Sequence, residues 1–268
     1  MARVRDACQR GIELTVRPVF QPIVELASGR IQAYEALSRL TDDKGSVVRP
    51  DDAFAAAEAG GYAAALDVLA IRAIASEAVR RLPPGARLFV NVSPATLLTC
   101  RHALKPLQPL ADRVVLEITE RRPIGRDEEQ KFLRTLDALR SIGYRLAIDD
   151  LGDGYASLGR MLTLRPEYVK LGQSLVGDVE ADPRRMAMVG SMVHFGARSG
   201  TTLVAEGIET QACYETLRGL GVELGQGYLF ARPSPEFGGG GPPGGGGWGP
   251  GPGGAGAPGE GDDGRQER

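Results

Sequence analysis

Cysteine is scarce in this sequence and long apolar runs are absent, and each shortage excludes a class of protein. The three cysteines, Cys8, Cys100 and Cys213, lie far apart and show no Cys-x-x-Cys spacing, which argues against a disulfide framework and a zinc site. We interpret them as buried, unreactive thiols. No stretch reaches about 18 consecutive apolar residues, and the N-terminus lacks the apolar core of a signal peptide. The sequence therefore predicts a cytoplasmic location and no membrane segment.

An excess of charge of one sign is also missing. The formal net charge is −2 and the isoelectric point is near 5.9, so no overall positive field exists to hold a nucleic-acid polymer or an anionic membrane. Any phosphate-bearing ligand must therefore bind at a local site. What is present, 42% hydrophobic and 25% charged residues over 268 positions, is typical of a globular protein with a sizeable core.

Composition changes sharply near the C-terminus. From Gly238 onward the sequence is dominated by glycine and proline, which bury too little apolar surface to offset the entropy of ordering the chain. We therefore divide the chain into a lead-in segment (1–16), one folded domain (17–237) and a disordered tail (238–268).

Short β-rich runs alternate with amphipathic stretches across the folded domain, which is typical of a parallel sheet or barrel. The predicted strands are 17–24, 31–39, 86–91, 113–119, 144–150, 167–171, 201–206 and 226–230. Only a Ser-Gly turn at 28–29 separates the first two, so these must form an antiparallel hairpin. The sequence predicts an α/β protein with a TIM-like (β/α)₈ barrel whose first strand is antiparallel.

Helix signals separate the strands. Asp51 and Asp52 open an alanine-rich pair of helices that ends near Leu82. A helix from Asp127 stops at Gly143, and another, capped by Asp182 with Pro183 at its first position, runs to Gly200.

Polar residues recur at the carboxyl ends of the predicted strands, where the loops of such a barrel converge on one mouth. They are Asn91, Glu117, Asp149, Asp150, Lys170 and Glu206, with Gln226 opening the last strand and Glu35 within the first hairpin. Each has an ordinary alternative: Glu117 could face solvent, and Asp149 or Asp150 could cap the turn at Gly152. Together, however, the carboxylates would repel one another unless cations compensate them.

The oxygen-only donor set favours Mg²⁺ or Mn²⁺ over Zn²⁺. His102 and His194 fall outside the predicted strand ends, which disfavours a histidine-based metallohydrolase. Lys170 stands at a predicted buried strand end among these carboxylates, where it would stay charged and could hold a water in place. A surface position for Lys170 is the alternative.

Seven motifs in order resemble the EAL-domain family of cyclic di-GMP phosphodiesterases. They are FQPIV (20–24), EALSR (35–39), FVNVSP (89–94), LEITE (116–120), DDLGDGYASL (149–158), AEGIET (205–210) and GQGYLFARP (225–233). The similarity spans roughly residues 3–237. It implies a bacterial second-messenger hydrolase that turns cyclic di-GMP into linear pGpG with two divalent cations, Mg²⁺ or Mn²⁺. Because proteins of this family often dimerise, it also implies a homodimer.

The resemblance also implies a ligand set for the two cations. By position, the first cation would be held by Glu35, Asn91, Glu117 and Asp149. Asp149 would bridge to a second cation that Asp150 also holds, with Glu206 supporting it directly or through water. Lys170, Glu35 and Glu206 form the predicted catalytic set, in which Lys170 orients the attacking water.

Further roles follow from the same motifs. Arg39 would meet a substrate phosphate, since its guanidinium can donate two hydrogen bonds at once, and Gln226 would line the same pocket. Glu120 would anchor the loop that begins at Asp150, and Glu209 would complete the supporting set. Gly152 and Gly154 would allow that loop to adopt positive φ and close on the substrate.

One position departs from the family pattern. Gly172 stands where the family usually has an aspartate, so a carboxylate is missing near the predicted mouth. This departure favours an alternative function, a catalytically weak domain that binds cyclic di-GMP as a signalling receptor. On the sequence alone, we expect Gly172→Asp to leave activity equal or raised. A barrel enzyme for sugar phosphates is less favoured, because AEGIET places carboxylates where a phosphate-binding glycine loop would be needed.

Overall fold

The computed structural model describes residues 2–4, 14–119, 126–153 and 158–238. Its strands are β1 (Ala2–Val4), β2 (Leu14–Glu25), β3 (Ile31–Thr41), β4 (Val47–Val48), β5 (Arg87–Val92), β6 (Val114–Ile118), β7 (Arg145–Leu151), β8 (Tyr168–Leu171), β9 (Thr202–Ala205) and β10 (Leu224–Gly225). The order β2-β10-β9-β8-β7-β6-β5-β3 is closed by pairing of β3 with β2. The two remaining strands pair outside this ring, β1 with β2 and β4 with β3. Eight strands therefore form a closed barrel.

The strand directions confirm the predicted fold class. Each neighbouring pair in the series β3, β5, β6, β7, β8, β9 and β10 is parallel. In contrast, β2 is antiparallel to both of its barrel neighbours, β3 and β10. The Ser-Gly hairpin between β2 and β3 causes this irregularity, because a tight turn can join only antiparallel strands.

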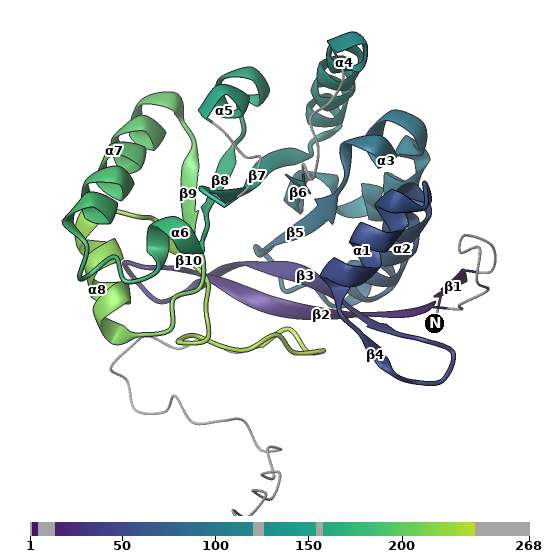
Figure 1. Ribbon diagram of the computed structural model, residues 1–268, viewed down its shortest axis with the longest axis horizontal. Coiled ribbons are helices and arrows are strands. Elements are labelled where there is room, and N and C mark those ends of the chain that lie inside the picture. The colour runs from purple at the N-terminus through teal and green to yellow at the C-terminus, as the bar shows by residue number, and fades with distance from the viewer. Residues whose placement is uncertain (1, 5–13, 120–125, 154–157, 239–268) are drawn as a thin grey trace, which may run out of the picture.

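Helices cover the outside of the barrel. They are α1 (Pro50–Ala59), α2 (Ala63–Arg81), α3 (Pro94–Thr99), the 3₁₀ segment η1 (Arg101–Arg113), α4 (Arg126–Ile142), α5 (Leu158–Leu164), α6 (Gln173–Val176), α7 (Pro183–Ser199) and α8 (Gln211–Leu220). Figure 1 shows α7 and α8 on one flank and α1, α2 and α3 on the opposite flank. The predicted cap of α7 is confirmed, since the Asp182 side chain accepts a hydrogen bond from the Arg184 N–H at 2.8 Å.

An apolar plug fills the inside of the barrel. It contains one buried residue from each of the eight strands: Ile23, Ala33, Phe89, Val115, Ala147, Tyr168, Val204 and Leu224. Alternate residues of the same strands, such as Leu88 and Val90 beside Phe89, pack instead into the larger core between strands and helices. This follows from the period of two in a β-strand, which sends successive side chains to opposite faces.

The prediction of a last strand over 226–230 is wrong, because β10 is only Leu224–Gly225. After β10 the chain turns sharply, with the Phe230 N–H donating to the Gly227 carbonyl at 3.1 Å. Gly227 lies so close to Ile208 that a Cβ there would be 2.1 Å from the Ile208 carbonyl oxygen. Gln226 therefore follows the last strand instead of opening it.

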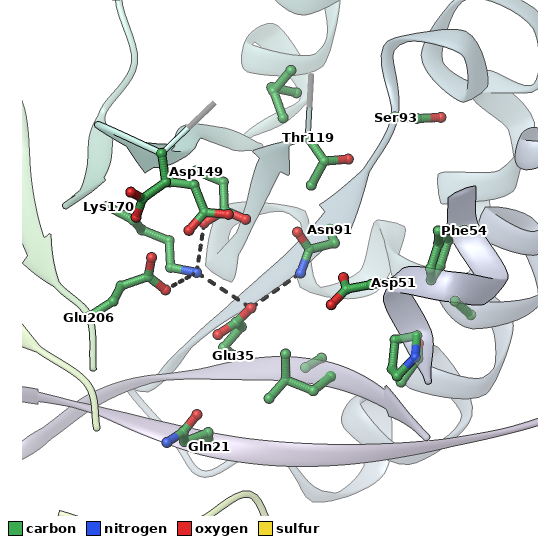
Figure 2. Close-up of a pocket in the computed structure, with 18 of the residues that line it drawn as sticks. Gln21, Glu35, Asp51, Phe54, Asn91, Ser93, Thr119, Asp149, Lys170 and Glu206 are labelled. Atoms are coloured by element: carbon green, nitrogen blue, oxygen red, sulfur yellow. Dashed lines mark hydrogen bonds and ion pairs between the residues drawn. The ribbon is translucent and has the colours of Figure 1, made fainter. Parts of the chain in front are cut away.

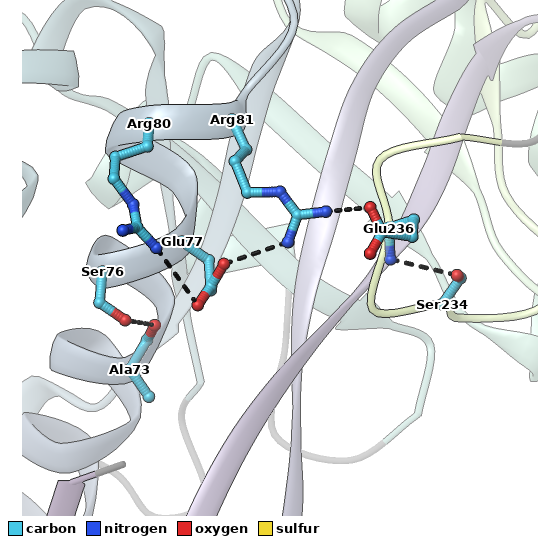
Figure 3. Close-up of polar contacts among 7 residues, drawn as sticks. All are labelled: Ala73, Ser76, Glu77, Arg80, Arg81, Ser234 and Glu236. Atoms are coloured by element: carbon cyan, nitrogen blue, oxygen red, sulfur yellow. Dashed lines mark hydrogen bonds and ion pairs between the residues drawn. The ribbon is translucent and has the colours of Figure 1, made fainter.

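Residues 231–237 lie beside the part of β2 that the short β10 leaves unpaired. Phe20 and Ser234 exchange backbone hydrogen bonds at 2.7 and 3.0 Å, and the Phe237 ring stacks on Phe20 with centroids 3.9 Å apart. Glu236 pairs with Arg81 at the end of α2, and Arg81 also reaches Glu77 at 3.1 Å (Figure 3). The segment thus covers a sheet edge that would otherwise stay open.

Among the helices that the structure describes, none combines the length and the apolar character needed to cross a bilayer.

Candidate active site

A set of polar side chains lies directly beyond the apolar plug. Each is two positions along the chain from a plug residue, six of them within the same strand and Glu206 and Gln226 directly after β9 and β10, which places them on the same inward side. The members are Gln21, Glu35, Asn91, Glu117, Asp149, Lys170, Glu206 and Gln226. We call them the polar ring. The predicted strand-end residues thus meet at one mouth of the barrel.

Lys170 is the centre of the polar ring. Its Nζ lies 2.7 Å from Glu206, 2.9 Å from Asp149 and 3.4 Å from Glu35 (Figure 2). It also lies 2.9 Å from Glu117. The side chain is only 1% exposed. A buried ammonium is stable only beside opposite charge, and here carboxylates on β3, β6 and β7 and directly after β9 supply it.

The electrostatics show how strongly these groups depend on one another. Burial would lower the pKa of Lys170, but Asp149, Glu117, Glu206 and Glu35 together raise that pKa well above its usual value. Burial raises the pKa of Glu206 to about 8 and that of Glu117 well above its usual value, although Lys170 opposes both shifts. Lys170 therefore stays charged, as the sequence predicts, while the carboxylates around it are incompletely compensated.

Amide side chains complete the polar ring. Asn91 Nδ2 donates to Glu35 Oε1 at 3.2 Å, and Gln226 Nε2 donates to Glu35 Oε2 at 2.7 Å and to Gln21 Oε1 at 2.9 Å. The Gln21 amide in turn donates to the Ala231 carbonyl at 3.1 Å. These bonds fix the orientation of the Glu35 carboxylate from both sides.

Gln21 belongs to this site, but the strand-end argument missed it. That argument considered the carboxyl ends of strands, whereas β2 is antiparallel and brings the residues that precede Ile23 to the mouth. The position of Gln21 two residues before the plug residue Ile23 was the available signal.

A second group of carboxylates at the mouth consists of Asp149, Asp150 and Glu206. One carboxylate oxygen from each lies within 4.8 Å of the others. Consecutive strand residues normally face opposite sides, but the register of β7 shifts between Ile148 and Leu151, and Asp150 has a φ of 50°. This irregularity allows two neighbouring carboxylates to meet Glu206.

The donor set fits divalent cations. Glu117 is fully buried, and apart from its ion pair with Lys170 its carboxylate has no hydrogen-bond partner among the described residues. Among the described residues, a single ammonium pairs with Glu35, Glu117, Asp149 and Glu206, and Asp150 adds an exposed carboxylate beside Asp149 and Glu206. Buried carboxylate oxygens left without donors are the usual ligands of hard cations.

A cavity of about 940 Å³ opens above the polar ring. Arg39, on the same face of β3 as Glu35, lines it, and so does Glu209.

Gly152, in the loop that was predicted to close on the substrate, has the expected positive φ, 104°. Glu120 and Gly154 lie outside the described residues. His102 and His194 are exposed on η1 and α7, which agrees with their exclusion from the site.

The EAL domain family model matches residues 1–233. This chain belongs to the EAL domain family. An uncharacterized protein of Sinorhizobium fredii, y4lL, is 33% identical over 87% of the chain. The cyclic di-GMP phosphodiesterase NbdA of Pseudomonas aeruginosa is 32% identical over 81% of the chain. The chain covers 28% of the length of each of these two relatives.

Solved structures agree with the family assignment. Klebsiella pneumoniae BlrP1, solved as a manganese/cy-diGMP complex, matches 89% of this EAL domain with a TM-score of 0.73 and 29% sequence identity. The match covers 60% of the BlrP1 chain.

Proposed function

We propose that this EAL domain hydrolyses cyclic di-GMP to linear pGpG with two divalent cations, Mg²⁺ or Mn²⁺. The observation that carries the proposal is the convergence of Glu35, Glu117, Asp149 and Glu206 on one buried ammonium at the mouth of the barrel. Such a concentration of buried and half-buried carboxylates is costly for folding, which supports a role that needs cations.

The chain offers two overlapping ligand groups. The first cation would be held by Glu35, Asn91, Glu117 and Asp149, and the second by Asp149, Asp150 and Glu206. The contact of Asn91 with Glu35 and the 4.8 Å grouping of the other three support this division. When bound, a pair of divalent cations activates a water and neutralises charge on the phosphodiester.

The remaining residues bind and orient. Lys170 has three N–H donors within the polar ring and would hold the attacking water by its oxygen. Arg39 lies further up the same cavity wall, where its guanidinium can pair with a phosphate. Gln21 and Gln226 hold Glu35 in one orientation. The cavity falls in the size range of small-molecule sites, about 300–1,000 Å³.

Similar proteins support the substrate. NbdA is named a cyclic di-GMP phosphodiesterase, and BlrP1 was solved with both manganese and cy-diGMP. The cytoplasmic location, the homodimer and the division into three segments stay predictions of the sequence.

The decisive experiment gives the purified chain cyclic di-GMP and Mn²⁺ and separates products by chromatography. We expect pGpG to accumulate, and a chelator to stop its formation. Binding of cyclic di-GMP without product, at enzyme concentrations close to that of the ligand, would instead establish the receptor function that the glycine at position 172 favours.

Glu35→Ala should abolish turnover, because it removes a ligand of the first cation and the partner of Asn91, Gln226 and Lys170. The rate of pGpG formation is the measurement. Asp137→Ala, which removes an exposed carboxylate on α4, is the matched control and should keep the parental rate. An unchanged rate in Glu35→Ala would contradict the ligand assignment.

A further inference from the structure

The short helix α6 begins without a capping side chain of its own. Its N-cap is Gly172, whereas this position usually carries Ser, Thr, Asn or Asp, whose oxygen accepts from a backbone N–H in the first turn. Here the acceptor comes from a distant residue. The Ser174 N–H lies 3.2 Å from each carboxylate oxygen of Asp153.

The carboxylate of Asp153 occupies the space that a side chain at position 172 would need. A Cβ on Gly172 would lie 2.3 Å from Asp153 Oδ2 and 3.0 Å from Asp153 Cγ. Real Cβ atoms do not approach other atoms so closely. A side chain at position 172 would therefore push the exposed Asp153 carboxylate out of its contact with Ser174, and the glycine leaves room for it.

The contact between Asp153 and the start of α6 lies beside the turn that carries Asp149 and Asp150, and backbone hydrogen bonds connect the two. The Asp153 N–H donates to the Asp150 carbonyl at 2.9 Å, and the Gly172 N–H donates to the Leu151 carbonyl at 3.1 Å. Asp150 has a φ of 50°, in the left-handed region that non-glycine residues rarely adopt. Such a conformation persists only where surrounding contacts hold it, and the Asp153 contact is one of them.

We propose that Asp153 is a positioning residue that holds the Asp149–Asp150 turn against the start of α6, and that the space beside the Ser174 N–H holds one carboxylate, from position 153 or from position 172. The carboxylate absent at position 172 is thus supplied from the loop after β7. This reverses the expectation for Gly172→Asp, which would place two carboxylates in one space. The role in turnover rests on the proposed function, but the geometry can be tested by cation binding alone.

The test is a double-mutant cycle with the full chain, its Asp153→Ala and Gly172→Asp variants, and the double variant. Mn²⁺ affinity is measured by calorimetric titration and the melting temperature by circular dichroism. Each single variant should bind Mn²⁺ roughly tenfold more weakly, as when a residue that orients a ligand is removed. The double variant restores one carboxylate to the shared space and should regain most of the affinity.

Asp182→Ala is the matched control, since it removes an equivalent cap from α7. It should lower the melting temperature without changing Mn²⁺ affinity, which separates positioning from general stability. Parental affinity in Asp153→Ala, or losses that simply add in the double variant, would overturn the proposal. A parent chain that binds Mn²⁺ but forms no pGpG would refute the proposed function alone, and a parent that binds no Mn²⁺ would refute both.

Discussion

At the scale of single residues, Lys170 and the cations that we propose compensate the same charges. The ammonium of Lys170 is within 3.4 Å of four carboxylates. Breaking a buried ion pair by removing one partner leaves the other charge uncompensated. Without Lys170, the folded chain should therefore depend much more on bound cations.

Lys170→Met should destabilise the chain in a chelator by about 3–5 kcal/mol. Mn²⁺ should then raise its melting temperature by more than it raises that of the parent, because only the cations remain to neutralise the carboxylates. Thermal unfolding with and without Mn²⁺ measures both effects. Lys131→Met, at an exposed position of α4, is the control, and an equal Mn²⁺ response in the parent and the Lys170 variant would contradict this account.

At the scale of elements, the end of β10 shows how backbone packing sets the position of a site residue. Gln226 is held between the Ala205 carbonyl, which accepts its N–H at 2.8 Å, and the close approach of Gly227 to Ile208. The neighbouring backbones can meet only because position 227 has no side chain.

Gly227→Ala should destabilise the chain by roughly 1–3 kcal/mol, the usual cost of forcing an extra carbon into a packed region, and should displace Gln226. Gly219→Ala is the matched control, because a Cβ there meets nothing within 4 Å in helix α8. That change should raise stability by up to about 1 kcal/mol. Denaturant unfolding of both variants checks the difference, and equal effects would show that the Ile208 contact does not limit this turn.

At the scale of the whole molecule, residues 231–237 follow β10 and contact both β2 and α2. Phe237 stacks on Phe20 and meets Tyr34 edge-on at 5.0 Å, while Glu236 pairs with Arg81 near the surface. The two kinds of contact should differ in strength, since exposed ion pairs contribute little and aromatic pairs contribute more.

Phe237→Ala should lower the free energy of unfolding by about 1–2 kcal/mol. Glu236→Gln should change it by less than about 1 kcal/mol, because the ion pair that it breaks is exposed. Chemical denaturation measures both in the full chain. A larger loss from Glu236→Gln would mean that the segment is held mainly by charge.

Much of this architecture was predictable from local patterns. The barrel, its antiparallel start and the cap of α7 followed from strand runs, a two-residue turn and Asp182 before Pro183. The strand over 226–230 was predicted wrongly because QGYLF has the composition of a strand, and the contact of Gly227 with Ile208 that bends it is not visible in sequence. Gln21 was missed because its place at the mouth depends on the direction of β2.

The sequence by itself determined which side chains face inward, because a strand alternates with a period of two and the plug and the polar ring are spaced accordingly. It therefore determined the acidic character of the mouth. Only the tertiary structure decided that Lys170 is the common partner of four carboxylates and that Asp153 fills the space left by Gly172. Both contacts join residues from different strands and loops, and their distances depend on barrel closure, which no local pattern encodes.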